Sequence, residues 1–235
     1  MTFYDKIKRH AEDSPKREVC GLLVRGFGSV KEPVVCPTAN LHPDPCGFQI
    51  PDAEVRHFMN EGRLVAYYHS HHADPAVFSD VDIQGSEHAR LPVFVYSLVD
   101  CRFNLYRPRS ATPAFEGRDF LLGLNDCIQI VTEWLWIHRT FAIPYVERTW
   151  QNVRDGYGDW PTVLGNAGMH ALALSDVGRI GDVLVFACGT ANSLTPNHTG
   201  IIVGPGVFLH QMYGRLSCVA SLSEWKDRIV QAYRI

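Results

Sequence analysis

The chain has 235 residues, of which 46% are hydrophobic and 20% charged. Such a composition supports one large globular domain or two of about 100–130 residues each. The formal net charge of −3 gives no basic excess, which excludes the electrostatic signature of a protein that binds nucleic acid or an anionic membrane.

The seven cysteines form an odd set without a Cys-x-x-Cys pair. This argues against a disulfide framework or a zinc knuckle and favours folding in a reducing compartment. The first residues, Met1–Lys6, have no apolar stretch of the kind found in a signal peptide. No run approaches the roughly 18 apolar residues of a membrane span, so we expect neither export by a signal nor a transmembrane segment.

Helices and strands alternate over the first 107 residues, which favours an α/β or α+β domain. Ser14-Pro15 ends an amphipathic helix, and Pro51 suits the first position of another. A polar loop is expected from Cys36 to Gly47. The expected helices cover 3–12, 51–62 and the residues after 79, and the expected strands cover 18–24, 30–35, 64–68, 92–98 and 101–107.

Two histidines and an aspartate have the spacing of a metal site. His69 and His71 come at the end of an apolar strand, so their imidazoles point to the same side. Ser79 begins a predicted helix with Asp82 in its first turn. A capping box and a packed histidine would explain the parts separately. Together they favour a catalytic zinc site held by His69, His71 and Asp82, with a fourth position for water.

A water bound to zinc has a lowered pKa, and a nearby group must accept its proton. A glutamate is the expected general base. Spacing alone does not distinguish among Glu12, Glu18, Glu32 and Glu54. However, the whole pattern, Glu18 … His69-x-His71-x7-Ser79-x2-Asp82, resembles the JAMM (MPN+, Mov34-type) family of zinc peptidases.

This resemblance implies that Zn²⁺ is the cofactor, that Glu18 activates the water, and that Ser79 helps to stabilise the oxyanion. The implied substrate is an amide or isopeptide bond. One residue departs from the family, because His72 stands where proline is usual. His72 could offer an alternative ligand or perturb the loop, but we expect a solvent-facing loop residue.

The pattern of elements starts again after Pro108–Pro113, a short polar stretch with proline at each end. We therefore predict a first domain at 1–107, a linker at 108–117 and a second domain at 118–235. Asn125 is expected to cap a helix that runs to about Thr140. Residues 150–173 are expected to be partly helical, followed by strands at 182–187, 199–203, 207–210 and 216–220.

Cys127 lies at the predicted start of this helix, where free N–H groups and the helix dipole favour the thiolate. His198 begins a predicted strand and His210 ends the next one. A helix-borne cysteine facing two histidines is the arrangement of a cysteine peptidase. Taken alone, Cys127 supports a nucleophile and a structural cysteine equally. A buried structural role is expected for Cys20, Cys36, Cys101, Cys188 and Cys218.

Four short motifs resemble the NlpC/P60 family of cell-wall peptidases. They are Asp126-Cys127, Gly181-Asp182-Val-Leu184, Asn197-His198-Thr-Gly-Ile-Ile-Val-Gly204 and Leu209-His210. The resemblance implies a papain-like α+β fold with Cys127 as nucleophile, His198 as base and His210 as the residue that orients it. It also implies that the substrates are peptidoglycan stem peptides. Ile128 and Gln129 replace the small residues that commonly follow the cysteine.

The predicted fold class is therefore α+β in two domains, a JAMM-like sheet domain with a zinc site followed by an NlpC/P60-like domain. This order resembles the tail tip assembly proteins of lambda-like siphophages. It implies tail tip proteins as partners, the host cytoplasm during assembly, and the virion tail tip afterwards. A non-catalytic assembly factor is the alternative hypothesis. An enzyme that processes ubiquitin-like or sulfur-carrier proteins would follow from the first domain alone.

Overall fold

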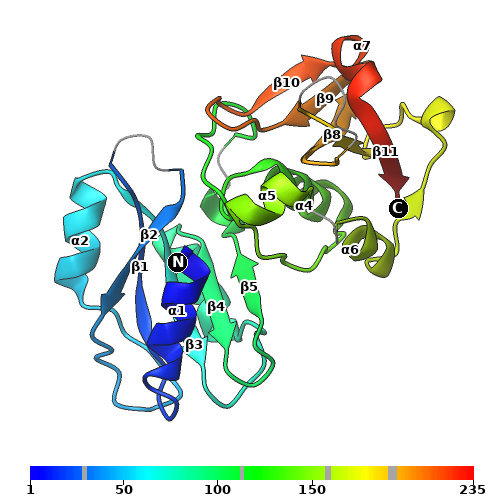
Figure 1. The fold of residues 1–235 in the computed structure, drawn as a ribbon. Helices are drawn as coiled ribbons and strands as arrows, with labels where there is room; N and C mark the ends of the chain where they lie inside the picture. The colour runs from blue at the N-terminus through cyan, green and yellow to red at the C-terminus, as the bar shows by residue number, and fades with distance from the viewer. Residues whose placement is uncertain (28–30, 112–113, 157–159, 190–194) are drawn as a thin grey trace. The chain divides into compact units, whose positions relative to one another are not determined.

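The computed structural model describes residues 1–27, 31–111, 114–156, 160–189 and 195–235. The chain divides into two compact units. Unit 1 contains Met1–Thr112 and Tyr145–Glu147, and unit 2 contains Pro113–Pro144 and Arg148–Ile235. Each unit combines helices with a β-sheet of its own (Figure 1), which confirms the predicted α+β class. None of the described helices has the length and apolarity needed to cross a membrane.

Unit 1 is built on a sheet with the strand order β2-β1-β3-β4-β5. Neighbouring strands are antiparallel except for β3 and β4, which are parallel because a helix connects them. The elements are α1 (Phe3–Glu12), β1 (Cys20–Arg25), β2 (Pro33–Thr38), α2 (Asp52–Asn60), β3 (Leu64–His71), α3 (Asp80–Ala89), β4 (Val93–Ser97), β5 (Phe103–Tyr106) and the 3₁₀ turn η1 (Arg109–Ala111).

The two faces of this sheet have different neighbours. Tyr68 pairs with Phe94 across β3 and β4, so both side chains emerge on one face. Helix α1 covers that face, with the ring of Phe3 edge-on to Phe94 at 5.9 Å. His69 and His71 alternate with Tyr68 along β3 and therefore emerge on the opposite face. One side of the sheet forms an aromatic core, and the other is available for a site.

The segment Tyr145–Glu147 completes unit 1 although it comes from the middle of unit 2 in sequence. The Tyr145 ring lies edge-on to Phe94 at 5.4 Å, and its hydroxyl is hydrogen-bonded to that of Tyr4. Glu147 forms an ion pair with Lys8 at 3.1 Å. The chain therefore passes from unit 2 into the aromatic core of unit 1 and back again.

Unit 2 contains a sheet with the strand order β10-β9-β8-β7-β11-β6, in which all neighbours are antiparallel. Helix α4 is buried almost all round, and it lies against β8 and β9. The elements are α4 (Cys127–Arg139), α5 (Trp150–Asp155), α6 (Trp160–Asn166), β6 (His170–Ala171), η2 (Leu174–Asp176), β7 (Val183–Phe186), β8 (His198–Gly204), β9 (Val207–His210), β10 (Cys218–Ser221), α7 (Leu222–Trp225), η3 (Lys226–Arg228) and β11 (Ile229–Arg234).

The predicted elements are largely present, and α1 and β9 have the predicted bounds. Three expectations were wrong. Strand β2 begins at Pro33 and runs to Thr38, so the predicted loop starts later than Cys36; the predicted start at Val30 lies outside the described residues. Helix α4 is capped by Asp126, because Asn125 closes a turn with Leu121. Helix α7 and strand β11 were not predicted.

Candidate active sites

The three predicted metal ligands form one buried cluster on β3 and α3. His69 and His71 share a face of β3, and their Nε2 atoms are 3.1 Å apart. An oxygen of Asp82 lies 3.3 Å from His69 Nε2, and the other oxygen lies 3.9 Å from His71 Nε2. Among the described residues this is the group of three whose ligand atoms all lie within 4.8 Å of one another. Two nitrogens and one oxygen converge on one point.

The protonation of the two rings suits a metal site. Burial lowers the pKa of His69 to about 4, so the ring is neutral at physiological pH and has a lone pair to offer. His71 Nδ1 lies 2.8 Å from the Pro75 carbonyl oxygen and donates its proton there. In the neutral tautomer that this bond selects, Nε2 is the nitrogen without a proton and faces Asp82, as in metal sites where the outer nitrogen of the histidine is held by a carbonyl group.

The cluster fits zinc. Zinc bonds of about 2.0–2.1 Å to nitrogen and about 2.0–2.2 Å to carboxylate oxygen would reach all three residues from one point. With no cation, two imidazole nitrogens stand 3.1 Å apart beside a carboxylate inside the protein, and one buried nitrogen, His69 Nδ1, has no hydrogen-bond partner among the described residues. Neutral imidazoles and a carboxylate are the donors that a divalent zinc ion selects.

A capping box fixes the carboxylate. Ser79 is the N-cap of α3, and its Oγ accepts a bond from the Asp82 N–H at 3.2 Å. In return, Asp82 Oδ2 accepts bonds of 2.8 Å from both the backbone N–H and the hydroxyl of Ser79. These bonds hold Oδ2 and leave Oδ1 directed at His69. The hydroxyl of Ser79, for which the family resemblance implies a role in oxyanion stabilisation, also holds the Asp82 carboxylate in this structure.

Glu18 lies beside the cluster because of the strand register. Cys20 pairs with His69 across β1 and β3, and the Ser70 N–H donates to the Val19 carbonyl at 2.9 Å. Continuing this register places Glu18 opposite His71 and on the same face of the sheet. Burial, and then the negative charge of Asp82, raise the pKa of Glu18 to about 8. The carboxyl group therefore binds a proton readily near neutral pH.

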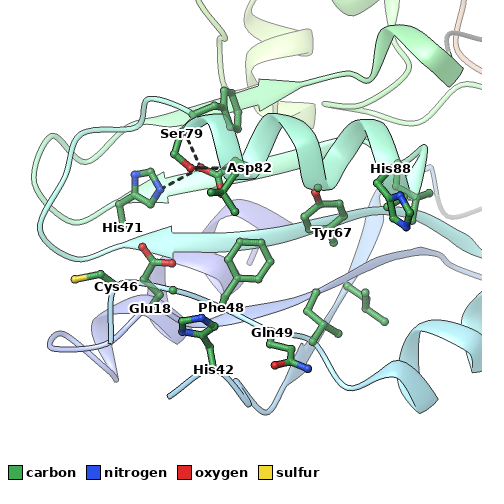
Figure 2. A pocket seen from close by; sticks show the side chains of 18 of the residues that line it. Glu18, His42, Cys46, Phe48, Gln49, Tyr67, His71, Ser79, Asp82 and His88 are labelled. Atoms are coloured by element: carbon green, nitrogen blue, oxygen red, sulfur yellow. Dashed lines mark hydrogen bonds and ion pairs between the residues drawn. The ribbon is translucent and has the colours of Figure 1, made fainter. Parts of the chain in front are cut away.

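These side chains line one end of a cleft with a volume of about 950 Å³. Figure 2 shows Glu18, His71, Ser79 and Asp82 together at one end and His88 at the other. Apolar residues form much of the wall between them: Leu22, Phe48, Val55, Leu64, Tyr67, Phe78 and Leu91. The cleft thus joins a polar end, which carries the cluster and Glu18, to a largely apolar wall.

His72 departs from its predicted position. It is half-buried rather than solvent-facing, and its Nε2 lies 3.9 Å from the sulfur of Cys46. It lies just beyond the end of β3, and it is not in the cluster of three. Cys46, which the sequence did not single out, lies on the rim of the cleft.

In unit 2 the two predicted histidines are in direct contact. His210 pairs with Gly200, two residues beyond His198, so both imidazoles emerge on the same face of the sheet. His198 Nε2 lies 2.9 Å from His210 Nδ1. Burial lowers the pKa of His198 well below its ordinary value and that of His210 to about 4, so both rings are neutral. The Trp225 ring of α7 lies 4.8 Å from the His210 ring.

Cys127 is the first residue of α4, as a thiol activated by a helix N-terminus requires. Its carbonyl oxygen accepts a bond of 2.8 Å from the hydroxyl of Thr199, the residue after His198. The helix start therefore lies against the start of β8. Consecutive strand residues point to opposite faces, so Thr199 contacts α4 while His198 lies on the face that carries Trp225. Only 2% of the Cys127 surface is exposed.

A buried ion pair, which the sequence analysis did not identify, holds the N-terminus of α4. Asp126 caps the helix and accepts a bond of 2.6 Å from Arg148 Nε, and both side chains are at most 1% exposed. Arg148 also donates to the carbonyl of Gly123 and to the side chain of Gln129. Arg148 lies 22 residues from Asp126 in the sequence, so no local pattern indicates the pairing. A helix cap can be recognised from sequence, but its tertiary partner cannot.

Replacing Arg148 with methionine is expected to destabilise unit 2 by about 3–5 kcal/mol, because Asp126 is left buried without its counter-charge. All five tryptophans belong to unit 2, so tryptophan fluorescence during urea unfolding reports this unit alone. Arg154→Met is the matched control, since Arg154 is exposed and its guanidinium donates to the neighbouring Gln151 side chain. Equal midpoints for the two variants would contradict a stabilising role for the buried pair.

Two of the cysteines that were expected to be buried are exposed. Cys101 and Cys218 are both at the surface, whereas Cys20 is buried as predicted and Cys36 and Cys188 are intermediate. Cys218 begins β10, opposite His210 in the strand register, and its sulfur lies 3.5 Å from His210 Nε2. No local pattern connects Cys218 with the histidines, because the pairing of β9 with β10 decides the contact.

Comparison with known proteins adds two sequence similarities. Residues 2–110 match the family model for prokaryotic homologs of the JAB domain, which confirms the JAMM-like assignment of the first part of the chain. Over 248 aligned residues the chain is 22% identical to the tail tip assembly protein K of Escherichia phage N15. That alignment covers 98% of this chain and 93% of the phage protein.

Three solved structures are similar to this chain. A Desulfitobacterium hafniense protein, known from its solution structure, is 25% identical and covers 43% of this chain and 75% of its own, with a TM-score of 0.35. An NLP/P60 family protein of Staphylococcus aureus is 15% identical and covers 99% of this chain and 61% of its own, with a TM-score of 0.35. An NlpC/P60 family protein of Bacillus cereus is 13% identical over 96% of this chain and 66% of its own, with a TM-score of 0.34.

Proposed function

We propose that this protein is a two-site peptide hydrolase of a phage tail tip. Unit 1 would cleave an amide or isopeptide bond with the help of zinc, and unit 2 would cleave peptidoglycan stem peptides with a thiol. The observation that carries the proposal is the convergence of His69, His71 and Asp82, with Glu18 opposite, at the end of a peptide-sized cleft. The end-to-end similarity to a tail tip assembly protein supports the biological setting.

In unit 1, His69, His71 and Asp82 would hold the zinc ion, whose positive charge lowers the pKa of a water molecule and polarises a carbonyl group. Glu18 faces the same point and accepts the proton of the attacking water. It then returns this proton to the leaving amine, for which a raised pKa is suited. Ser79 holds Asp82 in place throughout, and the apolar wall of the cleft binds the substrate on one side of the cleaved bond.

In unit 2, Cys127 would be the nucleophile, His198 its base and His210 the residue that orients the base. The sulfur would attack the peptide carbonyl as its proton passes to His198, and the same proton would then go to the leaving amine. This transfer requires the Cys127 side chain, at the start of α4, to reach the His198 ring at the start of β8. The neutral state of both rings supports the assignment of His198 as the base, because a base must be able to accept a proton. The contact of 2.9 Å between the two rings restricts the rotation of His198.

The setting that we propose follows from the similarity to the phage N15 protein. The protein would be made in the host cytoplasm, join other tail tip proteins during assembly, and reach the cell wall as part of the virion. A local opening of peptidoglycan would then accompany DNA entry.

Digestion of purified Gram-negative sacculi tests this proposal. We expect the isolated chain to release muropeptides cut within the stem peptide, detected by mass spectrometry, and we expect a zinc chelator to leave this cleavage unchanged. Chelator-sensitive release would assign wall cleavage to unit 1 instead. A chain that releases nothing, alone and within isolated tails, would exclude the wall peptidase.

One observation favours a second candidate, a tail tip assembly factor whose thiol site is structural. Cys127 is 2% exposed and His198 4%, and strand alternation directs His198 to the side of the sheet that carries Trp225. A substrate could reach these groups only after the covering residues move. In that case Cys127→Ala would leave DNA delivery into walled cells unchanged while a tail-binding defect appeared in variants with altered surfaces.

A further inference from the structure

We propose that Cys218 is a positioning residue of the thiol site, whose sulfur accepts a hydrogen bond from His210 when His198 carries the proton taken from the nucleophile. This inference rests on the proposed function of unit 2 and extends its three residues to a fourth. It assigns a task to an exposed cysteine that has no evident structural role.

The contacts form a continuous chain. Cys218 pairs with His210 across β10 and β9, so their side chains emerge on the same face. The Cys218 sulfur lies 3.5 Å from His210 Nε2, within the range for a hydrogen bond to sulfur. The other nitrogen of His210, Nδ1, lies 2.9 Å from His198 Nε2. The order in space is therefore Cys218, His210, His198.

The protons in this chain depend on each other. A neutral imidazole has one N–H group and one lone pair, whereas a charged imidazole has two N–H groups. Once His198 holds the proton from the nucleophile, its Nε2–H must donate to His210 Nδ1. Neutral His210 then carries its own proton on Nε2, which points at Cys218. The sulfur accepts this N–H group, which would otherwise be left without a partner in a residue that is 3% exposed.

The role is specific to the charged state of His198. In the resting state the sulfur can donate or accept, and either proton arrangement of the two rings is satisfied. In the charged state only the accepting arrangement is possible. Cys218 therefore stabilises the protonated base more than the neutral one, and its removal should slow the chemical step without weakening the binding of substrate.

Two variants of similar size separate this role from simple packing. Cys218→Val keeps the volume but removes the acceptor, and Cys218→Ser keeps an acceptor. We expect Cys218→Val to lower kcat for stem-peptide cleavage by about tenfold with an unchanged KM. It should also move the acidic limb of the pH–rate profile to lower pH, because protonated His198 loses a stabilising contact and its pKa falls. Cys218→Ser should retain the wild-type kcat and profile. Equal losses in the two variants, or a loss confined to KM, would overturn the proposal.

A second measurement does not require peptidase activity. Two-bond ¹H–¹⁵N spectra of the histidine rings in the intact chain, titrated toward acid, report which nitrogen of His210 is protonated. We expect Nε2–H at the pH where His198 becomes charged, with a ¹⁵N shift that differs between wild type and Cys218→Val but not between wild type and Cys218→Ser. If the wild-type spectra agree but no stem peptide is cut, the wall peptidase fails and the Cys218–His210 bond stands. If the ¹⁵N shift of His210 is the same in wild type and in both variants, the hydrogen bond between His210 and Cys218 is excluded.

Discussion

Replacing Cys127 with alanine is expected to reduce stem-peptide cleavage in purified sacculi by about a thousandfold or more. The methyl group cannot form the covalent intermediate, and only the contribution of substrate binding and polar stabilisation remains. Cys127 begins α4 and touches β8 through Thr199, so the substitution changes few contacts of the fold. The rate of muropeptide release, followed by mass spectrometry, gives the ratio.

The control is Cys101→Ala, which removes an exposed thiol from unit 1 and should leave the rate unchanged. His198→Ala should reduce cleavage as severely as Cys127→Ala, and the double variant should be no worse, because the two residues act as one unit. In phage, Cys127→Ala should assemble normal tails and deliver less DNA into walled cells. Normal DNA delivery by the Cys127→Ala phage would contradict the wall-peptidase interpretation.

The second large effect concerns the metal. His69→Ala is expected to weaken zinc binding by more than about a hundredfold, since even the groups that support a ligand are worth about 10–100-fold. Wild type purified without chelator should contain zinc in a one-to-one ratio by elemental analysis, and the variant should contain almost none after dialysis. Glu18→Gln should keep its zinc, because Glu18 faces the cluster without belonging to it.

His57→Ala is the matched control, because His57 is an exposed histidine on α2. Zinc retained by His69→Ala, or lost from His57→Ala, would contradict the proposed ligands. Comparing His69→Ala with Glu18→Gln then distinguishes a structural role of the metal from a catalytic one. If tails fail to mature with His69→Ala but mature normally with Glu18→Gln, the metal holds the loop and the proposed hydrolysis is dispensable.

The cluster of His69, His71 and Asp82 could be predicted from sequence because each part obeys a local rule. Strand alternation places His69 and His71 on one side, and a capping box places Asp82 at a helix start. Glu18 is different, since its position depends on how β1 pairs with β3. No local rule gives that register. Spacing in the sequence therefore left four glutamates as candidates for the general base, and only the family resemblance selected Glu18.

The thiol site was less accessible to sequence reasoning for the same physical reason. Its histidines come together through the pairing of β8 with β9, and Cys218 joins them through β10. Arg148 reaches Asp126 from outside α4, and Trp225 covers the histidines from a helix of four residues that has no periodicity to recognise. Long-range pairing decides all of these contacts, and a hydrophobic pattern reports only the faces of single elements.

The segment Tyr145–Glu147 bears on how such a chain can be rearranged by recombination. Tyr145 supplies a ring and a hydroxyl to the aromatic core around Tyr4 and Phe94, yet it is encoded between α4 and α5. Recombination at the linker would join residues 1–112 from one parent to a later segment from another parent. The core of the first unit would then depend on a tyrosine that the later segment encodes. A functional exchange of the first unit between related chains therefore requires that this tripeptide come from a compatible parent.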